Sequence, residues 1–221
     1  MLISVVIAED HDLTRKGVRS LLEDQLDARI AATTGDGLEV FPLVDEHNPD
    51  LLVLDLGLPH LNGLDVLRKI RERGIDVKVV ILSMHREDAY VTEAFDLGAS
   101  GYVLKGAPVE EVVEAVRAAV AGERYLSSGL SEEILDPSHS AEGEAGDRFD
   151  RLTDREREVL QLTAEGYTSK EVGERLCISH RTVDKHREHV KAKLGLNNTA
   201  EMAAYAHRRG LLPSQPDGEM D

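Results

Sequence analysis

The sequence predicts an α/β fold followed by a smaller, all-α domain. Five short apolar runs alternate with helix-period segments in the first part of the chain, at residues 2–8, 28–33, 51–54, 77–82 and 101–104. Most are apolar at consecutive positions, which is typical of strands buried on both faces of a parallel sheet. Residues 151–212 contain helical patterns and no strand-like alternation. We therefore expect a doubly wound, five-stranded parallel sheet joined to a helical domain.

The clearest helix of the first segment is predicted after the fifth strand, in the sequence PVEEVVEAVRAAVAG. Pro108 suits a first helical turn, and Gly122 suits the position after the last turn. The apolar face should comprise Val109, Val112, Val113, Val116, Ala119 and Val120. Pro42 falls within the segment expected to form the second helix, so that helix should start late or kink.

The charge of the chain is divided unevenly. Its formal net charge is −16, yet residues 151–212 carry 12 basic against 9 acidic residues, while residues 1–126 have a net charge of −10. Residues 127–150 are rich in Ser, Gly, Ala and acids, which is typical of a linker. We expect a first domain over 1–126, a linker over 127–150, a second domain over 151–212 and an acidic tail over 213–221. Such asymmetry favours different partners for the two domains.

The sequence also argues against a membrane or secretory protein. The longest apolar runs are far shorter than the roughly 20 residues of a membrane span. The first residues, MLISVVIAEDHD, lack the basic segment of a secretory signal. Cys177 is the single cysteine, so no internal disulfide can form, which fits a reducing compartment. We expect a cytoplasmic protein.

Functional groups follow the predicted strands. The first strand runs into Glu9 and Asp10, the third into Asp55, the fourth into Ser83 and the fifth into Lys105. Because the carboxyl ends of parallel strands lie on one edge of a sheet, these groups should converge. Three close carboxylates repel one another and require a positive charge. Oxygen-only ligands suit Mg²⁺ or Mn²⁺.

This set of residues, together with DLGLPHLNG after the third strand, resembles the receiver domain of two-component response regulators, a flavodoxin-like fold. The resemblance implies that Asp55 accepts a phosphoryl group from a sensor histidine kinase. Lys105 and the Ser83 hydroxyl would contact the phosphoryl oxygens, and Tyr102 would be the aromatic switch residue that moves with Ser83. The implied metal ligands are Glu9, Asp10, Asp55 and the backbone carbonyl of Gly57.

The second domain carries strong helix-start signals. Thr153 with Glu156 and Thr168 with Glu171 form two predicted capping boxes, and Ser179 is a good N-cap for a longer helix. Two short helices, a tight turn and a longer helix with a polar face are typical of a helix-turn-helix that reads DNA. On the longer helix, the residues expected to face the core are Val183, His186, Val190 and Leu194.

Residues 152–196 resemble the DNA-binding domain of the LuxR family. The resemblance implies a recognition helix over 179–194 in the major groove of double-stranded DNA, with Asp184, Lys185 and Glu188 at the base edges. The other implied DNA contacts are Ser169, Lys170, His180, Arg181, Thr182, Arg187 and Lys191. Gly173 stands where the family normally has Ala and should cost its helix up to ~1 kcal/mol.

Cys177, His180, His186 and His189 have the residue types of a zinc site. His180 and His186 are six residues apart on the predicted helix, about 240° around its axis, so they cannot share an ion. We expect His186 at the edge of the core and His189 exposed.

Taken together, the sequence is similar to response regulators of the NarL/FixJ type. We expect a phosphorylation-controlled transcription regulator that forms a homodimer when phosphorylated and is no enzyme beyond phosphoryl transfer to, and hydrolysis from, its own Asp55. One alternative is a constitutive DNA-binding regulator whose receiver is not phosphorylated. Another is a phosphate-transferring enzyme of the haloacid dehalogenase type, but Gly57 stands where that family has its second acid.

Overall fold

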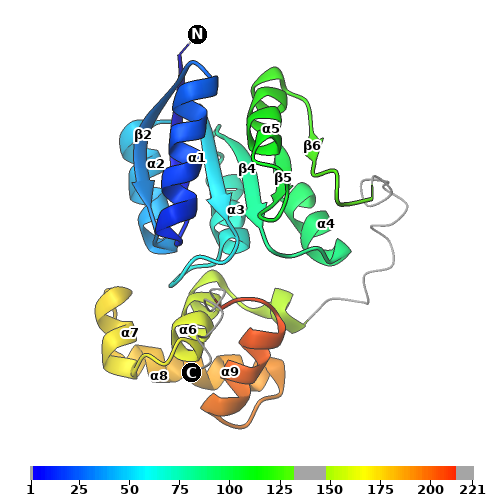
Figure 1. Cartoon of the computed structure of the whole chain (residues 1–221). Helices are drawn as coiled ribbons and strands as arrows, with labels where there is room; N and C mark the ends of the chain where they lie inside the picture. The colour runs from blue at the N-terminus through cyan, green and yellow to red at the C-terminus, as the bar shows by residue number, and fades with distance from the viewer. Residues whose placement is uncertain (1, 132–147, 213–221) are drawn as a thin grey trace, which may run out of the picture. The chain divides into compact units, whose positions relative to one another are not determined.

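The computed structural model describes residues 2–131 and 148–212, which fall into two compact units. The sheet and the helices packed on it form the first unit, and the C-terminal helices form the second (Figure 1). Of the predicted linker, only residues 127–131 and 148–150 lie within the described ranges, and the predicted tail over 213–221 lies outside them.

The first unit is built on a six-stranded parallel sheet in the order β2-β1-β3-β4-β5-β6. All five predicted strands are present, and a two-residue sixth strand extends the expected five-stranded sheet. Two residues are too few to show a hydrophobic period, so the sixth strand could not be predicted from the sequence. The strands are β1 (Ile3–Ala8), β2 (Ala28–Thr34), β3 (Leu51–Asp55), β4 (Lys78–Ser83), β5 (Gly101–Leu104) and β6 (Tyr125–Leu126).

Five helices cover the two faces of this sheet (Figure 1). On one face α1 contacts α5, and on the other α3 contacts both α2 and α4. The central strands are buried at consecutive positions, as expected for a sheet covered on both faces. The helices are α1 (Asp12–Gln25), α2 (Val40–His47), α3 (Gly63–Glu72), α4 (Asp88–Asp96) and α5 (Glu110–Ala121).

The prediction of the buried face of α5 is wrong at two residues. The helix begins at Glu110, and Val109 and Val120 are 59% and 47% exposed. Val109 precedes the first turn, and Val120 lies about 100° around the axis from the buried Ala119, beyond the reach of the sheet. Val112, Val113, Val116 and Ala119 are buried as predicted, and Ala115 is buried with them. Gly122 ends the helix with a positive φ of 82°, as expected.

Pro42 explains how the second helix begins. A 3₁₀ turn, η1 (Gly37–Glu39), precedes α2, and Pro42 is the third residue of α2. The N–H groups of a first helical turn have no partner within the helix, so proline removes no hydrogen bond there. The predicted late start is confirmed.

The first residues of the predicted linker pack against α5. The buried carboxylate of Glu111 accepts hydrogen bonds from the hydroxyls of Ser127 and Ser128. These bonds hold the chain that leaves β6 beside the helix.

All the regular elements between residues 148 and 212 are helices, and the predicted caps are confirmed. Both capping boxes are formed, and the Ser179 side chain accepts a hydrogen bond from the backbone N–H of Thr182. Phe149, which falls within the predicted linker, is buried in the core of this unit. The elements are η4 (Arg148–Arg151), α6 (Asp154–Ala164), α7 (Ser169–Arg175), α8 (His180–Leu194) and α9 (Thr199–Arg208). Across both described ranges, no helix combines the length and apolarity that crossing a membrane requires.

Gly63 allows α3 to start against the end of β3. Its N–H donates to the Leu56 carbonyl at 3.0 Å, and a Cβ at this position would lie 2.3 Å from the Asp55 carbonyl oxygen. Only a residue without a side chain tolerates this approach, so Gly63 fixes the backbone around Asp55.

We predict that Gly63→Ala lowers the free energy of unfolding by about 1–3 kcal/mol, because the added methyl group displaces the backbone next to Asp55. Urea unfolding of the full chain measures the change. The control is Gly17→Ala in α1, where an added Cβ meets nothing within 4 Å and should be neutral or stabilising. Equal stability of the two variants would contradict the prediction.

Candidate functional site

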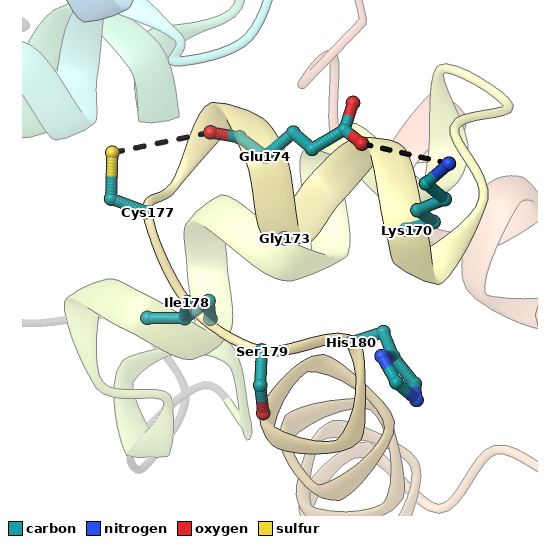
Figure 2. A pocket seen from close by; sticks show the side chains of 7 residues that line it. All are labelled: Lys170, Gly173, Glu174, Cys177, Ile178, Ser179 and His180. Carbon is teal, nitrogen blue, oxygen red and sulfur yellow. Dashed lines mark hydrogen bonds and ion pairs between the residues drawn. The ribbon is translucent and has the colours of Figure 1, made fainter.

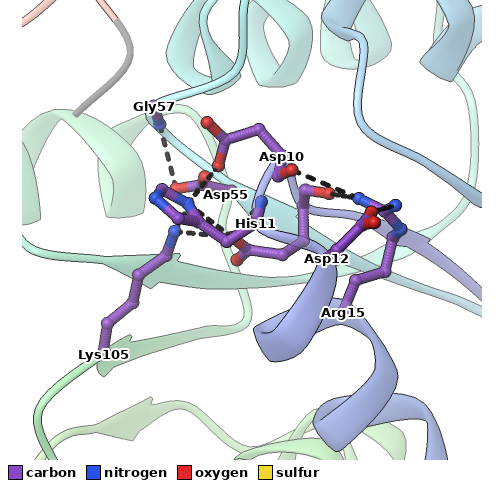
Figure 3. Close-up of polar contacts among 8 residues, drawn as sticks. Asp10, His11, Asp12, Arg15, Asp55, Gly57 and Lys105 are labelled. Carbon is purple, nitrogen blue, oxygen red and sulfur yellow. Dashed lines mark hydrogen bonds and ion pairs between the residues drawn. The ribbon is translucent and has the colours of Figure 1, made fainter. Parts of the chain in front are cut away.

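The groups that follow the strands converge at one edge of the sheet, as predicted. The strand order reverses between β1 and β3, which lie side by side, and ligands bind at such a switch point in open α/β sheets. Glu9 and Asp10 follow β1, and Asp55 ends β3 (Figure 3). Glu9 and Asp55 are buried, whereas the Asp10 side chain is 18% exposed.

Lys105 bridges the two buried acids. Its Nζ lies 2.9 Å from Glu9 Oε1 and 2.8 Å from Asp55 Oδ2 (Figure 3). The other oxygen of Asp55, Oδ1, accepts a hydrogen bond from the Gly57 N–H at 3.0 Å. The Lys105 ammonium therefore contacts two of the three carboxylates, and Asp10 lies beside them, so the carboxylates outnumber this ammonium.

This charge balance changes the acidity of the central groups. Burial raises the pKa of Asp55 to about 7, Lys105 opposes this rise, and Glu9 adds to it. For Lys105, burial disfavours the charged amine, but the attraction of Asp55 and Glu9 outweighs it and raises the pKa. Lys105 is thus a permanent cation, and Asp55 carries a carboxylate that a further positive charge would stabilise.

The donor set fits a hard divalent cation. Glu9, Asp10 and Asp55 present carboxylate oxygens, and together with a nitrogen of His11 their donor atoms lie within 4.8 Å of one another. Glu9 Oε2 is buried and has no hydrogen-bond partner among the described residues. A buried carboxylate oxygen without a partner is unfavourable, and a cation would satisfy it. Mg²⁺ prefers such oxygen ligands.

His11 and Arg15 are parts of the site that the sequence did not predict. His11 Nδ1 lies 2.5 Å from Asp10 Oδ1. The Arg15 guanidinium donates to the backbone carbonyls of Glu9 and Asp10 at 2.5 and 3.4 Å (Figure 3). Neither residue stands directly at a strand end; Arg15 reaches back from the first turn of α1. The only sequence signal is a basic residue five or six positions after the acids.

Ser83 and Tyr102, the predicted switch residues, both contact His85. Ser83 is buried at the end of β4, and its Oγ accepts the His85 N–H at 3.0 Å. The Tyr102 side chain is fully buried, and its hydroxyl donates to the His85 carbonyl at 3.0 Å. Burial raises the pKa of Tyr102, so its hydroxyl stays protonated at neutral pH. The Ser83 hydroxyl and the Tyr102 hydroxyl therefore bind the same short segment.

The second candidate surface lies on α7 and α8. Of the ten residues implied as DNA contacts, six are exposed and four are partly buried. The exposed ones are Lys170, His180, Arg181, Asp184, Lys185 and Glu188, and the others are Ser169, Thr182, Arg187 and Lys191. The exposed basic and acidic groups of α8 are thus free of the core and available to a ligand.

Arg187 is engaged within the protein. Its guanidinium donates to Thr163 Oγ1 at 2.9 Å, Ser169 Oγ at 2.8 Å and the Tyr167 carbonyl at 2.7 Å. Ser169 Oγ in turn donates to Asp184 at 2.5 Å. These bonds tie α8 to the end of α6, to the loop after it and to the start of α7. Arg187 therefore positions α8 as well as being a predicted phosphate contact.

The turn between α7 and α8 is closely packed at Gly173 (Figure 2). A Cβ on Gly173 would lie 2.7 Å from the Ile178 carbonyl oxygen, and Cys177 has a positive φ of 53°. Glycine lowers the helix propensity at position 173, as expected. It also allows the turn to pack closely against α7, which a side chain at this position would prevent. The hollow in Figure 2 is open to solvent and lined by Lys170, Gly173, Glu174, Cys177, Ile178, Ser179 and His180.

The comparisons with known proteins match both units. The family model "Response regulator receiver domain" matches residues 5–117, and "Bacterial regulatory proteins, luxR family" matches residues 150–206. The "Oxygen regulatory protein NreC" of Staphylococcus haemolyticus is 38% identical, over 95% of this chain and 99% of that protein.

Solved structures agree with these family matches. A LuxR-family two-component response regulator from Aurantimonas is 34% identical with a TM-score of 0.58, over 61% of this chain and 96% of that one. A structure described as two RcsB dimers bound to two parallel DNAs is 25% identical with a TM-score of 0.57, over 94% of this chain and 98% of that one.

A parallel sheet with this acidic edge, followed by a helix-turn-helix, defines a two-component regulator that binds DNA. The chain belongs to the response regulators of the NarL/FixJ type, with a receiver domain and a LuxR-type DNA-binding domain. Its function is phosphorylation-controlled regulation of transcription.

We predict that metal-free protein loses stability as the pH rises from about 4 to about 7, because the proton on Asp55 stabilises the folded form while the pKa in the unfolded chain is near 3.8. Asp55→Asn removes this contribution. In EDTA, the free energy of unfolding of the variant, relative to that of wild type, should be at least about 1 kcal/mol larger at pH 8 than at pH 5. Urea unfolding at both pH values measures this gain.

The control for this pH comparison is Asp45→Asn, at an exposed position of α2. Its stability relative to wild type should be the same at both pH values. A constant difference between Asp55→Asn and wild type would show that Asp55 titrates in its ordinary range.

Proposed function

We propose that Asp55 is the phosphoryl acceptor of this regulator and that a sensor histidine kinase is the donor. The observation that carries the proposal is the contact of Lys105 Nζ with both Asp55 and Glu9 at the carboxyl edge of the sheet. Phosphoryl transfer depends on positioning and on stabilisation of charge, and a carboxylate nucleophile beside a fixed ammonium provides both.

In the proposed transfer, a carboxylate oxygen of Asp55 attacks the phosphorus of the kinase phosphohistidine. The new P–O bond forms as the P–N bond breaks, and the electron pair of that bond stays on the imidazole nitrogen. The Lys105 ammonium balances charge on the phosphoryl oxygens, and the Gly57 N–H holds Asp55 in orientation.

A divalent cation is part of this proposal. Mg²⁺, or Mn²⁺ in its place, would supply charge neutralisation at the phosphoryl oxygens. Its proposed ligands are Asp10, Asp55 and the backbone carbonyl of Gly57, with Glu9 acting directly or through water. The buried Glu9 Oε2, which no described residue contacts through a hydrogen bond, supports a cation at this position.

The response is proposed to pass through Ser83 and Tyr102. Phosphorylated Asp55 carries about −1.5 to −2 charges at neutral pH. The Ser83 hydroxyl would leave the His85 N–H to bind a phosphoryl oxygen, and Tyr102 would follow because it binds the same segment. The shift favours a homodimer, which places two DNA-binding domains on half-sites about one helical turn apart.

The DNA contacts of the proposed dimer come from α7 and α8. Asp184, Lys185 and Glu188 are proposed to read base edges. Phosphate contacts are proposed for Ser169, Lys170, His180, Arg181, Thr182, Arg187 and Lys191. The net charge of only +3 over residues 151–212 gives a single domain modest affinity, so pairing of two domains increases binding. We place the regulator in the cytoplasm, with the domain limits given by the sequence.

We predict that wild-type protein gains one phosphoryl group when incubated with acetyl phosphate and Mg²⁺, and that Asp55→Ala gains none, because its nucleophile is absent. Intact-mass spectrometry measures the adduct. The control Asp45→Ala, an exposed acid of α2, should be modified as wild type is. No adduct on wild type would favour a constitutive regulator, and an adduct on Asp55→Ala would place the acceptor elsewhere.

We predict different effects for two lysines of the DNA-binding domain. On a site selected from random DNA by wild type, Lys185→Ala should cost about 1–3 kcal/mol and relax the preference at one base pair. Lys170→Ala should weaken binding to all sequences. It should also reduce, by about one, the steepness with which the logarithm of the affinity falls with the logarithm of the salt concentration. Fluorescence anisotropy at several salt concentrations measures both effects.

The control for the DNA measurements is Lys16→Ala, on the exposed side of α1 in the other domain. It should leave the affinity and the sequence preference unchanged. Equal effects of Lys185→Ala on specific and random DNA would show that Lys185 contacts phosphate and not a base.

A further inference from the structure

A second group of candidate ligands lies in the DNA-binding domain, on α6 and α8. Glu156, His186 and His189 each offer one donor atom, and these atoms lie within 4.8 Å of one another. His186 and His189 are three residues apart on α8 and therefore project from neighbouring positions of one side of the helix. Their ring centroids are 6.5 Å apart with the planes nearly perpendicular. Two imidazoles and a carboxylate thus meet between the two helices.

Glu156 is held in place by the fold. It is the third residue of α6 and closes the capping box with Thr153, and its Oε2 accepts the Thr153 N–H at 2.8 Å. The same Oε2 lies 2.6 Å from Lys193 Nζ. Oε1 takes part in neither contact and lies 3.6 Å from His189 Nδ1, which is too long for a hydrogen bond. One oxygen of a buried, fixed carboxylate therefore faces an imidazole without bonding to it.

The imidazole of His186 has an unused nitrogen. Its Nδ1 is buried and has no hydrogen-bond partner among residues 2–131 and 148–212. Burial lowers the pKa of His186, and the nearby positive groups Arg155 and Lys185 add to this effect against the attraction of Glu156. Neutral imidazole is the form of histidine that binds metal ions.

We propose that Glu156, His186 and His189 form a site for a divalent transition-metal ion, Zn²⁺ by preference, which links α6 to α8. Imidazole nitrogen suits Zn²⁺ better than it suits Mg²⁺ or Ca²⁺. Three protein ligands and one water complete the tetrahedral coordination that Zn²⁺ adopts. The site is separate from the acidic edge of the sheet and does not depend on the proposed phosphoryl transfer.

The geometry needs only small side-chain movements. Zinc–ligand distances of about 2.0–2.2 Å place tetrahedral donor atoms roughly 3.3 Å apart. Rotation of the His189 ring can close the present spacing, because its side chain is 50% exposed. Cys177 and His180 take no part in this group, which agrees with the expectation that His180 and His186 cannot share an ion. The third ligand is Glu156, which the sequence did not place beside the histidines.

Lys193 is the main competitor for the carboxylate. Its ammonium already neutralises Glu156, and its side chain is 34% exposed, so it can turn into solvent when an ion binds. The resulting competition limits affinity for the metal. Removing the ammonium should therefore strengthen metal binding, whereas removing an imidazole should weaken it, and this difference in sign identifies the site.

The test is isothermal titration calorimetry of the full chain with Zn²⁺, in excess Mg²⁺ so that the acidic edge of the sheet is already occupied. One equivalent of Zn²⁺ should bind wild type. His189→Asn should weaken binding at least about tenfold, and Lys193→Met should tighten it. The control His207→Asn, an exposed histidine of α9, should bind as wild type does. Circular dichroism checks that each variant is folded.

Cobalt absorption gives a second measurement of the same site. Co²⁺ bound to wild type should show the visible spectrum of tetrahedral coordination, and His189→Asn should lose it. The proposal is overturned if wild type binds no Zn²⁺, if His189→Asn binds Zn²⁺ as tightly as wild type, or if Lys193→Met weakens binding. Loss of acetyl phosphate reactivity at Asp55 has no bearing on it, because the two sites share no residue.

Discussion

The charge balance at the carboxyl edge of the sheet is the constraint on which the receiver domain depends. A single ammonium, that of Lys105, lies between the buried carboxylates of Glu9 and Asp55, with Asp10 beside them. Burial, with the nearby Glu9 carboxylate, raises the pKa of Asp55, and Glu9 Oε2 has no hydrogen-bond partner within residues 2–131 and 148–212. Compensating positive charge stabilises a fold that buries these acids, so its stability is coupled to the binding of cations.

This cluster exists because the strands beneath it are apolar at most consecutive positions. Consecutive buried residues in β1, β3 and β4 need helices on both faces, and that arrangement brings all the strand ends to one edge. Gly63 lets α3 begin against the end of β3 and so fixes the peptide that carries Asp55. In the other domain, the capping boxes at Thr153 and Thr168 set where α6 and α7 begin.

The sequence predicted what depends on local pattern, and it missed what depends on contacts between distant segments. Apolar runs located five strands, and strand-end residues such as Asp55 and Lys105 located the pocket. The two-residue β6 carries no period, and Phe149 sits alone among polar residues, so neither could be found. Residue type also failed to show that Arg187 is bound internally, or that Glu156 lies beside two histidines, because both facts require the packing of α8 on its neighbours.

Arg15 has a consequence for how the acidic dipeptide meets an incoming ion. Its guanidinium binds the main-chain oxygens of Glu9 and Asp10 rather than their carboxylates. The peptide units are therefore immobilised, while the carboxylate of Asp10, which contacts His11 Nδ1, can exchange that partner for an ion without a change in the main chain. Folding has already ordered that stretch of main chain, so the binding of an ion there costs little further conformational entropy. The main chain of this site is therefore preorganised for an ion, and only its side chains adjust when the ion binds.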